Sequence, residues 1–234
     1  MKVIFCGAHP DDAEIYAFGT LLAWRATGAE VVLYVAAQGN KGTAARTAGR
    51  DLSDVRRAEA EASAALLGAR LVMSGLPDLG IGPARLRLAS QLQHLFHQER
   101  PDVIVTHSAN DYHADHRALS VTVALAAGDD FPVVFADTMK GTGFTPTHYV
   151  DITRFQERKF AAIRLHHSQK PRRYVLAAQA LAAGRGRQAT GQEGRFMEGF
   201  RFDPSPRFRS VDHLFPPGSL VASIVDPSTT GRIE

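Results

Sequence analysis

Two short polar stretches of the sequence, Gly7–Glu14 and His113–His116, hold residues that could do chemistry together. The first places one histidine and three acids in a single turn, which is unfavourable unless a positive group lies among them. His9 and Asp12 stand three residues apart, and this spacing points both side chains the same way once a helix begins. The second stretch adds two imidazoles and a carboxylate. We therefore interpret the two stretches as halves of one metal site.

Two histidines and one carboxylate form a typical ligand set for catalytic zinc, with one position left open for water. The ion would lower the pKa of that water and polarise a substrate carbonyl. Asp11 is the natural group to take the proton from the water. His113 could hydrogen-bond a developing oxyanion or protonate a leaving amine, and Asp115 could hold its ring nitrogen. The pattern predicts attack of water on a carbonyl group.

A simpler interpretation makes each stretch the start of a helix. Asp11 or Asp12 would then hydrogen-bond the free amides of the first helical turn, with no metal involved. For either stretch alone, we consider the two interpretations about equally good. The choice depends on whether the fold brings the stretches together.

The elements around the two stretches alternate between strand and helix. Apolar runs predict strands at Lys2–Gly7, Val31–Ala36, Arg70–Met73 and Pro101–Thr106. Helices are predicted at Ala13–Thr27, Asp51–Leu67, Pro83–Gln98 and His116–Ala127. This order predicts an α/β, Rossmann-like three-layer fold, with a mostly parallel sheet and helices on both faces. The polar stretches follow the first and fourth strands, at carboxyl ends, where such sheets bind ligands. That coincidence favours the metal site.

The second half of the chain is less regular. We expect a strand at Pro132–Ala136, an edge strand at Tyr149–Ile152, a helix at Pro171–Ala183 and a mobile basic loop at Gly184–Gly194. Prolines are frequent from Asp203 onward, which predicts an irregular C-terminal tail. We therefore divide the chain into a domain at residues 1–202 and a tail at residues 203–234. The tail is expected to pack on the domain or on a neighbouring subunit.

The composition is that of an ordinary globular protein, with 44% hydrophobic and 22% charged residues among 234. The formal charge is only +3, so nothing argues for a nucleic-acid partner. Cys6 is the single cysteine, which excludes a disulfide within the chain and favours a reducing, cytoplasmic location. The sequence has no signal-peptide features and no apolar segment near the ~20 residues that span a bilayer, so we expect no membrane association.

The motifs also carry a family resemblance. Ala8–Glu14 and His113–His116 are similar to the two motifs of the zinc-dependent N-acetylglucosaminyl deacetylases of the LmbE-like, or PIG-L-like, family. The resemblance extends to the strand Pro101–His107, to Arg56, Glu59 and Leu67–Gly68 on one helix, and to the short motif His166–Gln169. It runs from residue 1 to about residue 200. The last thirty or so residues match no pattern of the family.

The resemblance implies roles for single residues. Zn²⁺, with Fe²⁺ or Co²⁺ as other candidate ions, would be bound by His9, Asp12 and His116. Asp11 would be the general base, His113 would stabilise the oxyanion, and Arg56 would contact the substrate. Glu14 is expected to support the first turn through hydrogen bonds.

Three more polar residues lie near the predicted site. Asp78 follows another strand and could bind a sugar hydroxyl, although a turn-forming aspartate explains it equally well. Asn110 and Asp111 adjoin the second motif and would line the pocket, with Asn-Asp turn chemistry as the alternative. Substrate choice is expected to depend on the loops Gln38–Gly49, Gly141–His148 and Gly184–Gly194.

These features predict a zinc-dependent hydrolase that removes the N-acetyl group from an N-acetylglucosamine-type amino sugar. The same site could serve an amidase that cleaves a larger N-acyl group from a sugar–thiol conjugate. Two histidines and a carboxylate also form the triad of non-haem iron oxygenases, which usually have β-barrel folds. A metal-dependent binding module would have no use for Asp11 and His113. The expected partners are a small amino-sugar substrate and, by the resemblance, further copies of the chain in a homo-oligomer.

Overall fold

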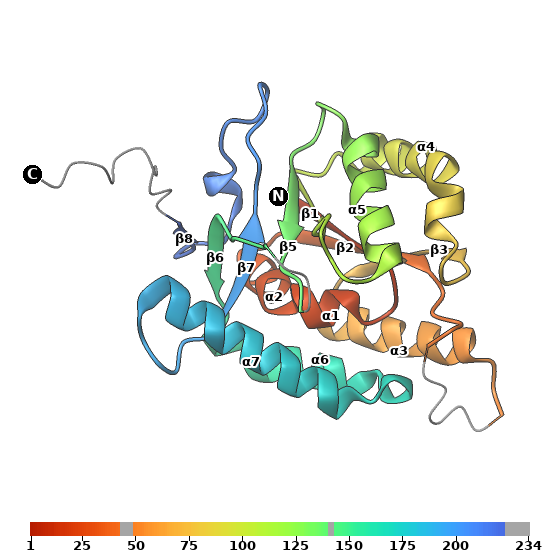
Figure 1. The fold of residues 1–234 in the computed structure, drawn as a ribbon, viewed down its shortest axis with the longest axis horizontal. Helices are drawn as coiled ribbons and strands as arrows, with labels where there is room; N and C mark the ends of the chain where they lie inside the picture. Colours follow the sequence, from red (N-terminus) through yellow and green to blue (C-terminus); the bar gives the residue numbers. More distant parts are fainter. Residues whose placement is uncertain (43–48, 140–142, 223–234) are drawn as a thin grey trace, which may run out of the picture.

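The computed structural model describes residues 1–42, 49–139 and 143–222. In these residues an eight-stranded sheet lies between two layers of helices (Figure 1). Two of the loops expected to select the substrate, Gln38–Gly49 and Gly141–His148, lie partly outside the described residues. Among the described helices, none combines the length and the apolar surface that a membrane crossing requires.

The half of the sheet that carries the polar stretches is parallel. It consists of β1 (Lys2–Gly7), β2 (Glu30–Ala37), β3 (Arg70–Leu76), β4 (Val103–His107) and β5 (Val133–Ala136). The strand order is β3-β2-β1-β4-β5, so Val3 pairs with Val31 on one side and with Val103 on the other. The order reverses between β1 and β4, and α/β sheets bind ligands at such a switch point. The predicted fold class is confirmed.

The other half of the sheet is antiparallel. β7 (Met197–Arg201) lies between β5 and β6 (His148–Asp151), and β8 (Leu220–Val221) pairs with the far side of β6. The prediction that the strand around Tyr149 is an edge strand is therefore wrong. Its outer side is covered by a strand from the tail, far along the sequence.

Helices cover both faces of the sheet (Figure 1). One face carries α4 (Ile81–Glu99) and α5 (Ala114–Ala127); the other carries α1 (Asp12–Tyr16), α2 (Phe18–Ala26), α3 (Leu52–Leu67), α6 (Gln156–Leu165) and α7 (Pro171–Thr190). Successive strand residues point to opposite faces. In β1, Val3 and Phe5 pack under α1 and α2, whereas Ile4 and Cys6 pack under α4 and α5. The continuous apolar run of β1 follows from burial on both faces.

Two helices differ from their predicted extents. The helix predicted at Ala13–Thr27 is interrupted at Ala17, whose φ of −141° and ψ of 2° are not helical. In contrast, α7 continues to Thr190, through much of the predicted loop Gly184–Gly194. Tertiary contacts hold that last part helical, because Arg185 binds the Asp137 carboxylate and a Cβ at position 186 would collide with a carbonyl oxygen. Intrinsic helix propensity is a weak guide where such contacts exist.

The described part of the tail packs on the domain. The ring of Phe215 stacks on Trp24 at 5.8 Å between centroids and on His148 at 4.5 Å. Trp24 Nε1 donates a hydrogen bond to the carbonyl oxygen of Leu214 (2.7 Å), and His148 Nε2 lies 3.0 Å from Asp212 Oδ1. Val211 and Phe215 thereby join the core beneath α2.

Candidate metal centre

The two polar stretches meet at the carboxyl ends of β1 and β4. His9 and Asp12 follow β1, and His113 and His116 stand at the start of α5. One ligand atom from each of His9, His113 and His116 lies within 4.8 Å of the others, and the same holds for Asp12, His107 and His116. The structure therefore brings together all the side chains from which the metal ligands were predicted.

The spacing of the donor atoms fits a small metal ion. Asp12 Oδ1 lies 3.3 Å from His116 Nε2, and Asp12 Oδ2 lies 3.8 Å from His9 Nδ1. Two ligand atoms, each ~2.0–2.1 Å from a tetrahedral zinc ion, are roughly 3.4 Å apart. These distances fit an ion bound by Asp12 with His9 and His116, but the donor atoms that all lie within 4.8 Å of one another form the groups His9–His113–His116 and Asp12–His107–His116. That His9, Asp12 and His116 are the ligands stays a prediction.

A carboxylate stands behind each of the two histidines. His9 Nε2 lies 3.1 Å from Asp115 Oδ2, and His116 Nδ1 lies 3.1 Å from Asp111 Oδ1. In each ring the other nitrogen is left for the ion, as in the carboxylate–histidine–metal arrangement. Asp115 holds the ring nitrogen of His113 through its backbone amide, which donates to Nδ1 (3.2 Å), whereas its carboxylate contacts His9. Asp111, expected in the pocket wall, is buried behind His116.

The charges of the site call for a cation. Burial raises the pKa of Asp12, but the imidazoles of His116 and His107 outweigh it and hold that pKa well below its usual range. Burial lowers the pKa of His116, yet the carboxylates of Asp12 and Asp111 raise it to about 10. The carboxylates thus keep a positive charge on His116, which a bound metal ion would supply instead.

Asp11 is not used as a helix cap. It occupies the N-cap position of α1, but its side chain makes no capping hydrogen bond. Its φ of 114° is unusual for a residue other than glycine, and such strain is typical of functional sites. Asp11 Oδ1 lies 3.1 Å from Arg56 Nη2. Burial raises the pKa of Asp11, against the lowering effect of Arg56 and with a further rise from Asp12. The simple capping interpretation does not account for this carboxylate.

Arg56 and Asp78 hold the surrounding loops. The Arg56 guanidinium is buried and donates to the carbonyl oxygens of Pro10 and Gly39. The Asp78 carboxylate accepts from the amides of Gly39 (2.8 Å) and Lys41 (2.9 Å). Both side chains line the cavity beside the metal ligands. That either one also contacts substrate stays a prediction.

His113 faces the same cavity in a defined tautomer. Its Nδ1 accepts a hydrogen bond from the amide of Asp115 (3.2 Å), so a neutral ring carries its proton on Nε2. Burial and the neighbouring His9 lower the pKa of His113, which favours the neutral ring. His113 can therefore donate a hydrogen bond from Nε2.

Asn110 lies apart from the site. It is exposed, its amide oxygen accepts from the Ser108 hydroxyl, and it lines a different hollow beside Phe135 and Phe144. The structure does not bring Asn110 to the metal ligands, so its predicted role in substrate binding has no support from this geometry.

His107, the last residue of β4, also lies in the site, although no role was predicted for it. Its ring stacks on His116 with centroids 3.9 Å apart, and its Nε2 lies 3.1 Å from both Asp12 Oδ2 and the Ala8 amide nitrogen. His107 thus lies against the Asp12 carboxylate, and Nε2 donates to it or accepts from the Ala8 amide according to which nitrogen carries the ring proton. Its place at the carboxyl end of the fourth strand, six residues before the second polar stretch, was the available signal.

Replacing His107 with phenylalanine should weaken metal binding about 10- to 100-fold, because a residue behind a ligand typically contributes that much. The phenyl ring keeps the stacking on His116 but removes the nitrogen beside Asp12. Competition with a chelator measures the affinity, and His94→Phe, on the exposed side of α4, is the matched control. Equal zinc affinity of the two variants would contradict this role.

The motif His166–Gln169 braces the site from α6. His166 Nε2 lies 3.4 Å from Glu14 Oε1, and the Ser168 amide and hydroxyl donate to the Glu59 carboxylate at 2.8 and 2.7 Å. These contacts connect the motif to α1 and α3. Glu14 is thereby paired with the His166 motif, and its support of the first turn through hydrogen bonds stays a prediction.

We expect the contact of His166 with Glu14 to make stability depend on pH. Burial lowers the pKa of His166, but the carboxylates of Glu14 and Asp11 together outweigh it, so the folded-state pKa lies above the ordinary value. The stabilisation is then fully present below pH ~6.5 and is lost as the pH rises through the raised pKa. Urea unfolding between pH 6 and 9 measures it. His166→Gln should remove this part of the pH dependence, whereas an unchanged profile would refute the assignment.

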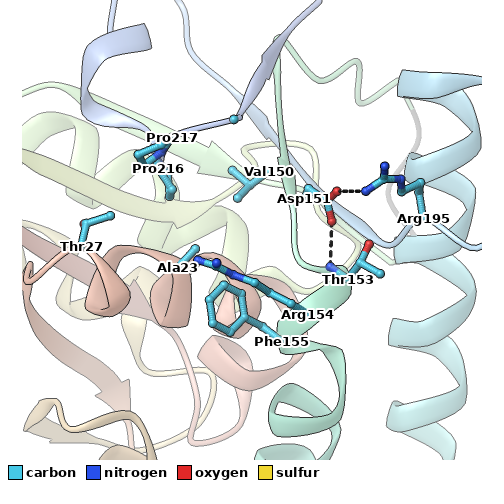
Figure 2. A pocket seen from close by; sticks show the side chains of 11 residues that line it. Ala23, Thr27, Val150, Asp151, Thr153, Arg154, Phe155, Arg195, Pro216 and Pro217 are labelled. Carbon is cyan, nitrogen blue, oxygen red and sulfur yellow. Dashed lines mark hydrogen bonds and ion pairs between the residues drawn. The ribbon is translucent and has the colours of Figure 1, made fainter.

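A cavity of about 320 Å³ opens over the predicted metal ligands. Its other walls are mostly polar and aromatic, with Lys41, Tyr112, Gln169 and Tyr174, and Ile15 and Leu79 add apolar surface. A larger hollow of about 580 Å³ lies elsewhere, between α2, β6 and the tail (Figure 2). There the Asp151 carboxylate is held by Arg195 and the Thr153 amide, and the described lining residues include no histidine or cysteine. The chemistry therefore points to the smaller cavity.

Fold and site together define a class of protein. It is a three-layer α/β protein whose sheet carries, at its switch point, a histidine–aspartate centre of the kind that holds a catalytic metal. The family model of PIG-L, described as GlcNAc-PI de-N-acetylase, matches residues 4–127. The chain belongs to this family.

Relatives and solved structures agree with this assignment. A diacetylchitobiose deacetylase of Thermococcus kodakarensis is 27% identical over 231 residues, covering 87% of this chain and 83% of that protein. The structure of N,N'-diacetylchitobiose deacetylase from Pyrococcus horikoshii matches with a TM-score of 0.76 at 26% identity, covering 87% of this chain and 84% of that one. The 4-carboxy-2-hydroxymuconate hydratase GalB of Pseudomonas putida KT2440 shares the fold, with a TM-score of 0.74, 21% identity and coverage of 86% and 95%.

Proposed function

We propose that this protein is a metal-dependent N-deacetylase that removes the acetyl group from an N-acetylglucosamine-type amino sugar. The observation that carries the proposal is the arrangement around Asp11. A carboxylate free of any capping bond lies beside a histidine–aspartate centre at the edge of an open cavity. The family and two deacetylases of diacetylchitobiose among its relatives support the substrate class.

The metal would be held by His9, Asp12 and His116, with Asp115 and Asp111 orienting the two imidazoles. When bound, a divalent ion lowers the pKa of a water molecule and polarises the substrate carbonyl. Zinc is the proposed ion, and Fe²⁺ and Co²⁺ accept the same ligands.

The protein's own groups carry the protons. Asp11 takes a proton from the attacking water, while Arg56 holds its carboxylate in place through the 3.1 Å contact. His113 donates a hydrogen bond from Nε2 to the carbonyl oxygen as it becomes negative. The carbon–nitrogen bond then breaks, and the departing nitrogen receives from Asp11 the proton that Asp11 took from water. Acetate and the free amine are the products.

The cavity suits a sugar of modest size. Its volume of about 320 Å³ lies near the lower end of the ~300–1,000 Å³ typical of small-molecule sites. Tyr112 and Tyr174 offer aromatic surfaces, and Lys41 and Gln169 offer polar groups. We also retain the cytoplasmic location and the homo-oligomer as predictions from the sequence.

The direct test is hydrolysis of N-acetylglucosamine and N,N'-diacetylchitobiose by the zinc-loaded protein. We expect acetate and primary amine to appear in equal amounts, and chelation of the metal to stop both. The amidase alternative predicts instead faster cleavage of a bulky N-acyl glucosamine than of the acetyl compound. An anaerobic assay separates hydrolysis, which needs no oxygen, from oxygenase chemistry. Absence of amine release from every one of these substrates would reject the proposal.

A further inference from the structure

The break between α1 and α2 is occupied by a buried ion pair from distant parts of the chain. Lys159 on α6 and Glu198 on β7 are 2% and 4% exposed, and Lys159 Nζ lies 2.6 Å from Glu198 Oε1. A buried ion pair is weak evidence for stability, because desolvation offsets the attraction. Its position in the structure indicates another role.

The Lys159–Glu198 pair forms hydrogen bonds with three of the backbone groups that would otherwise join the two helices. In a continuous helix the Ile15 carbonyl would accept from the Gly19 amide, four residues later. Here Lys159 donates to the Ile15 carbonyl (2.8 Å), and Glu198 Oε1 accepts from the Gly19 amide (3.1 Å). Glu198 Oε2 accepts from the Thr20 amide (2.7 Å), whose helical partner would be the carbonyl of residue 16.

Helical hydrogen bonds resume on both sides of the break. The Ala17 amide donates to the Ala13 carbonyl (3.0 Å), and the Leu21 amide donates to the Ala17 carbonyl (2.9 Å). The break therefore lies at the non-helical backbone of Ala17. No proline accounts for it.

α2 itself is fixed in the core. Gly19 lies so close to Ile152 that a Cβ there would be 2.6 Å from its side chain, and Leu21 and Trp24 are buried. If the two helices joined, α1 would have to move onto the axis of α2. Asp12 is the first residue of α1 and Asp11 its N-cap, so both would move with it.

We infer that Lys159 and Glu198 are positioning residues, which hold α1 apart from α2 so that Asp11 and Asp12 face His116. They contact neither the cavity nor the proposed ligands, and they act through the backbone of residues 15–20. This role rests on the proposed metal site for its functional consequence, whereas the break in the helix can be observed without a metal.

The test replaces both charges in the full-length protein, with Lys159→Met and Glu198→Leu combined. Removing both partners leaves no single buried charge, so the variant should fold. The Ile15 carbonyl and the Gly19 amide are then free to pair, and we expect a crystal structure of the metal-free variant to show one continuous helix. Its affinity for zinc should fall about tenfold or more, with a lower kcat at saturating zinc.

The control removes an exposed pair of the same kind, Arg187 and Glu193, whose closest charged atoms are 3.5 Å apart. Arg187→Met with Glu193→Leu should leave zinc affinity unchanged. An unaltered break at residue 17 or a zinc affinity within twofold of wild type in the Lys159/Glu198 variant would overturn the inference.

Should the double variant fail to fold, Lys159→Met with Glu198→Gln decides, because it leaves no unpaired buried charge and keeps the length of the Glu198 side chain. The single amide oxygen of the glutamine can accept from only one of the two amides, so zinc affinity should fall below that of wild type, and an unchanged affinity would overturn the inference. The two proposals fail separately. A wild-type protein that binds no zinc rejects the proposed function, whereas the state of the helix break in the variant still tests the role of the pair.

Discussion

Asp11→Asn should lower kcat by a factor on the order of 10² or more while the protein keeps its full complement of metal. The amide retains the shape of the side chain and can still accept from Arg56, but it cannot take a proton from water. Activity on N,N'-diacetylchitobiose and metal content by mass spectrometry measure the two quantities.

The matched control for this change is Asp54→Asn, on the exposed side of α3, the helix that carries Arg56. It should behave as wild type. If Asp11→Asn keeps full turnover with stoichiometric metal, Asp11 is not the base. If it loses the metal as well, Asp11 belongs with the ligands.

Loss of a metal ligand should have the larger effect. His116→Ala should lower kcat/KM by a factor on the order of 10³ or more, because several kcal/mol of charge stabilisation disappear with the ion. The variant should also lose its zinc on dialysis. Removal of zinc from the wild type with a chelator should reproduce the loss, and added zinc should restore activity to the wild type alone.

His94→Ala provides the control, since His94 is an exposed histidine on α4. It should retain metal and activity. Wild-type turnover by His116→Ala, or full activity of the chelated wild-type protein, would reject metal-dependent catalysis.

Much of the fold could be predicted because buried strands and helix faces appear in the sequence as short apolar runs and periodic apolar positions. β1 and β4 are short apolar runs buried on both faces, and each is followed directly by a polar stretch. Since the carboxyl ends of parallel strands share one edge, His9, Asp12 and His116 were expected to meet. Local pattern and global topology agree at this place, as they do in readily folding proteins.

The remaining errors concern contacts between distant segments. Nothing around Ala17 marks a helix break, because its cause lies at positions 159 and 198. The end of α7 depends in the same way on Asp137. Asp115 has a local explanation: its backbone amide reaches the ring of His113, but residues two apart on a helix do not face each other, so its carboxylate points away from that ring and reaches His9.

The insertion of β7 between β5 and β6 also determines when, during synthesis of the chain, the metal site can be completed. Chains leave the ribosome from the N-terminus, and their earliest segments begin to fold first. Here the proposed metal ligands are all made by residue 116, but Glu198 lies on β7 and Phe215, which packs on Trp24, comes later still. A nascent chain that already contains every ligand therefore still lacks the parts that set the first helix. We expect zinc binding to mature only after nearly the whole chain has been released.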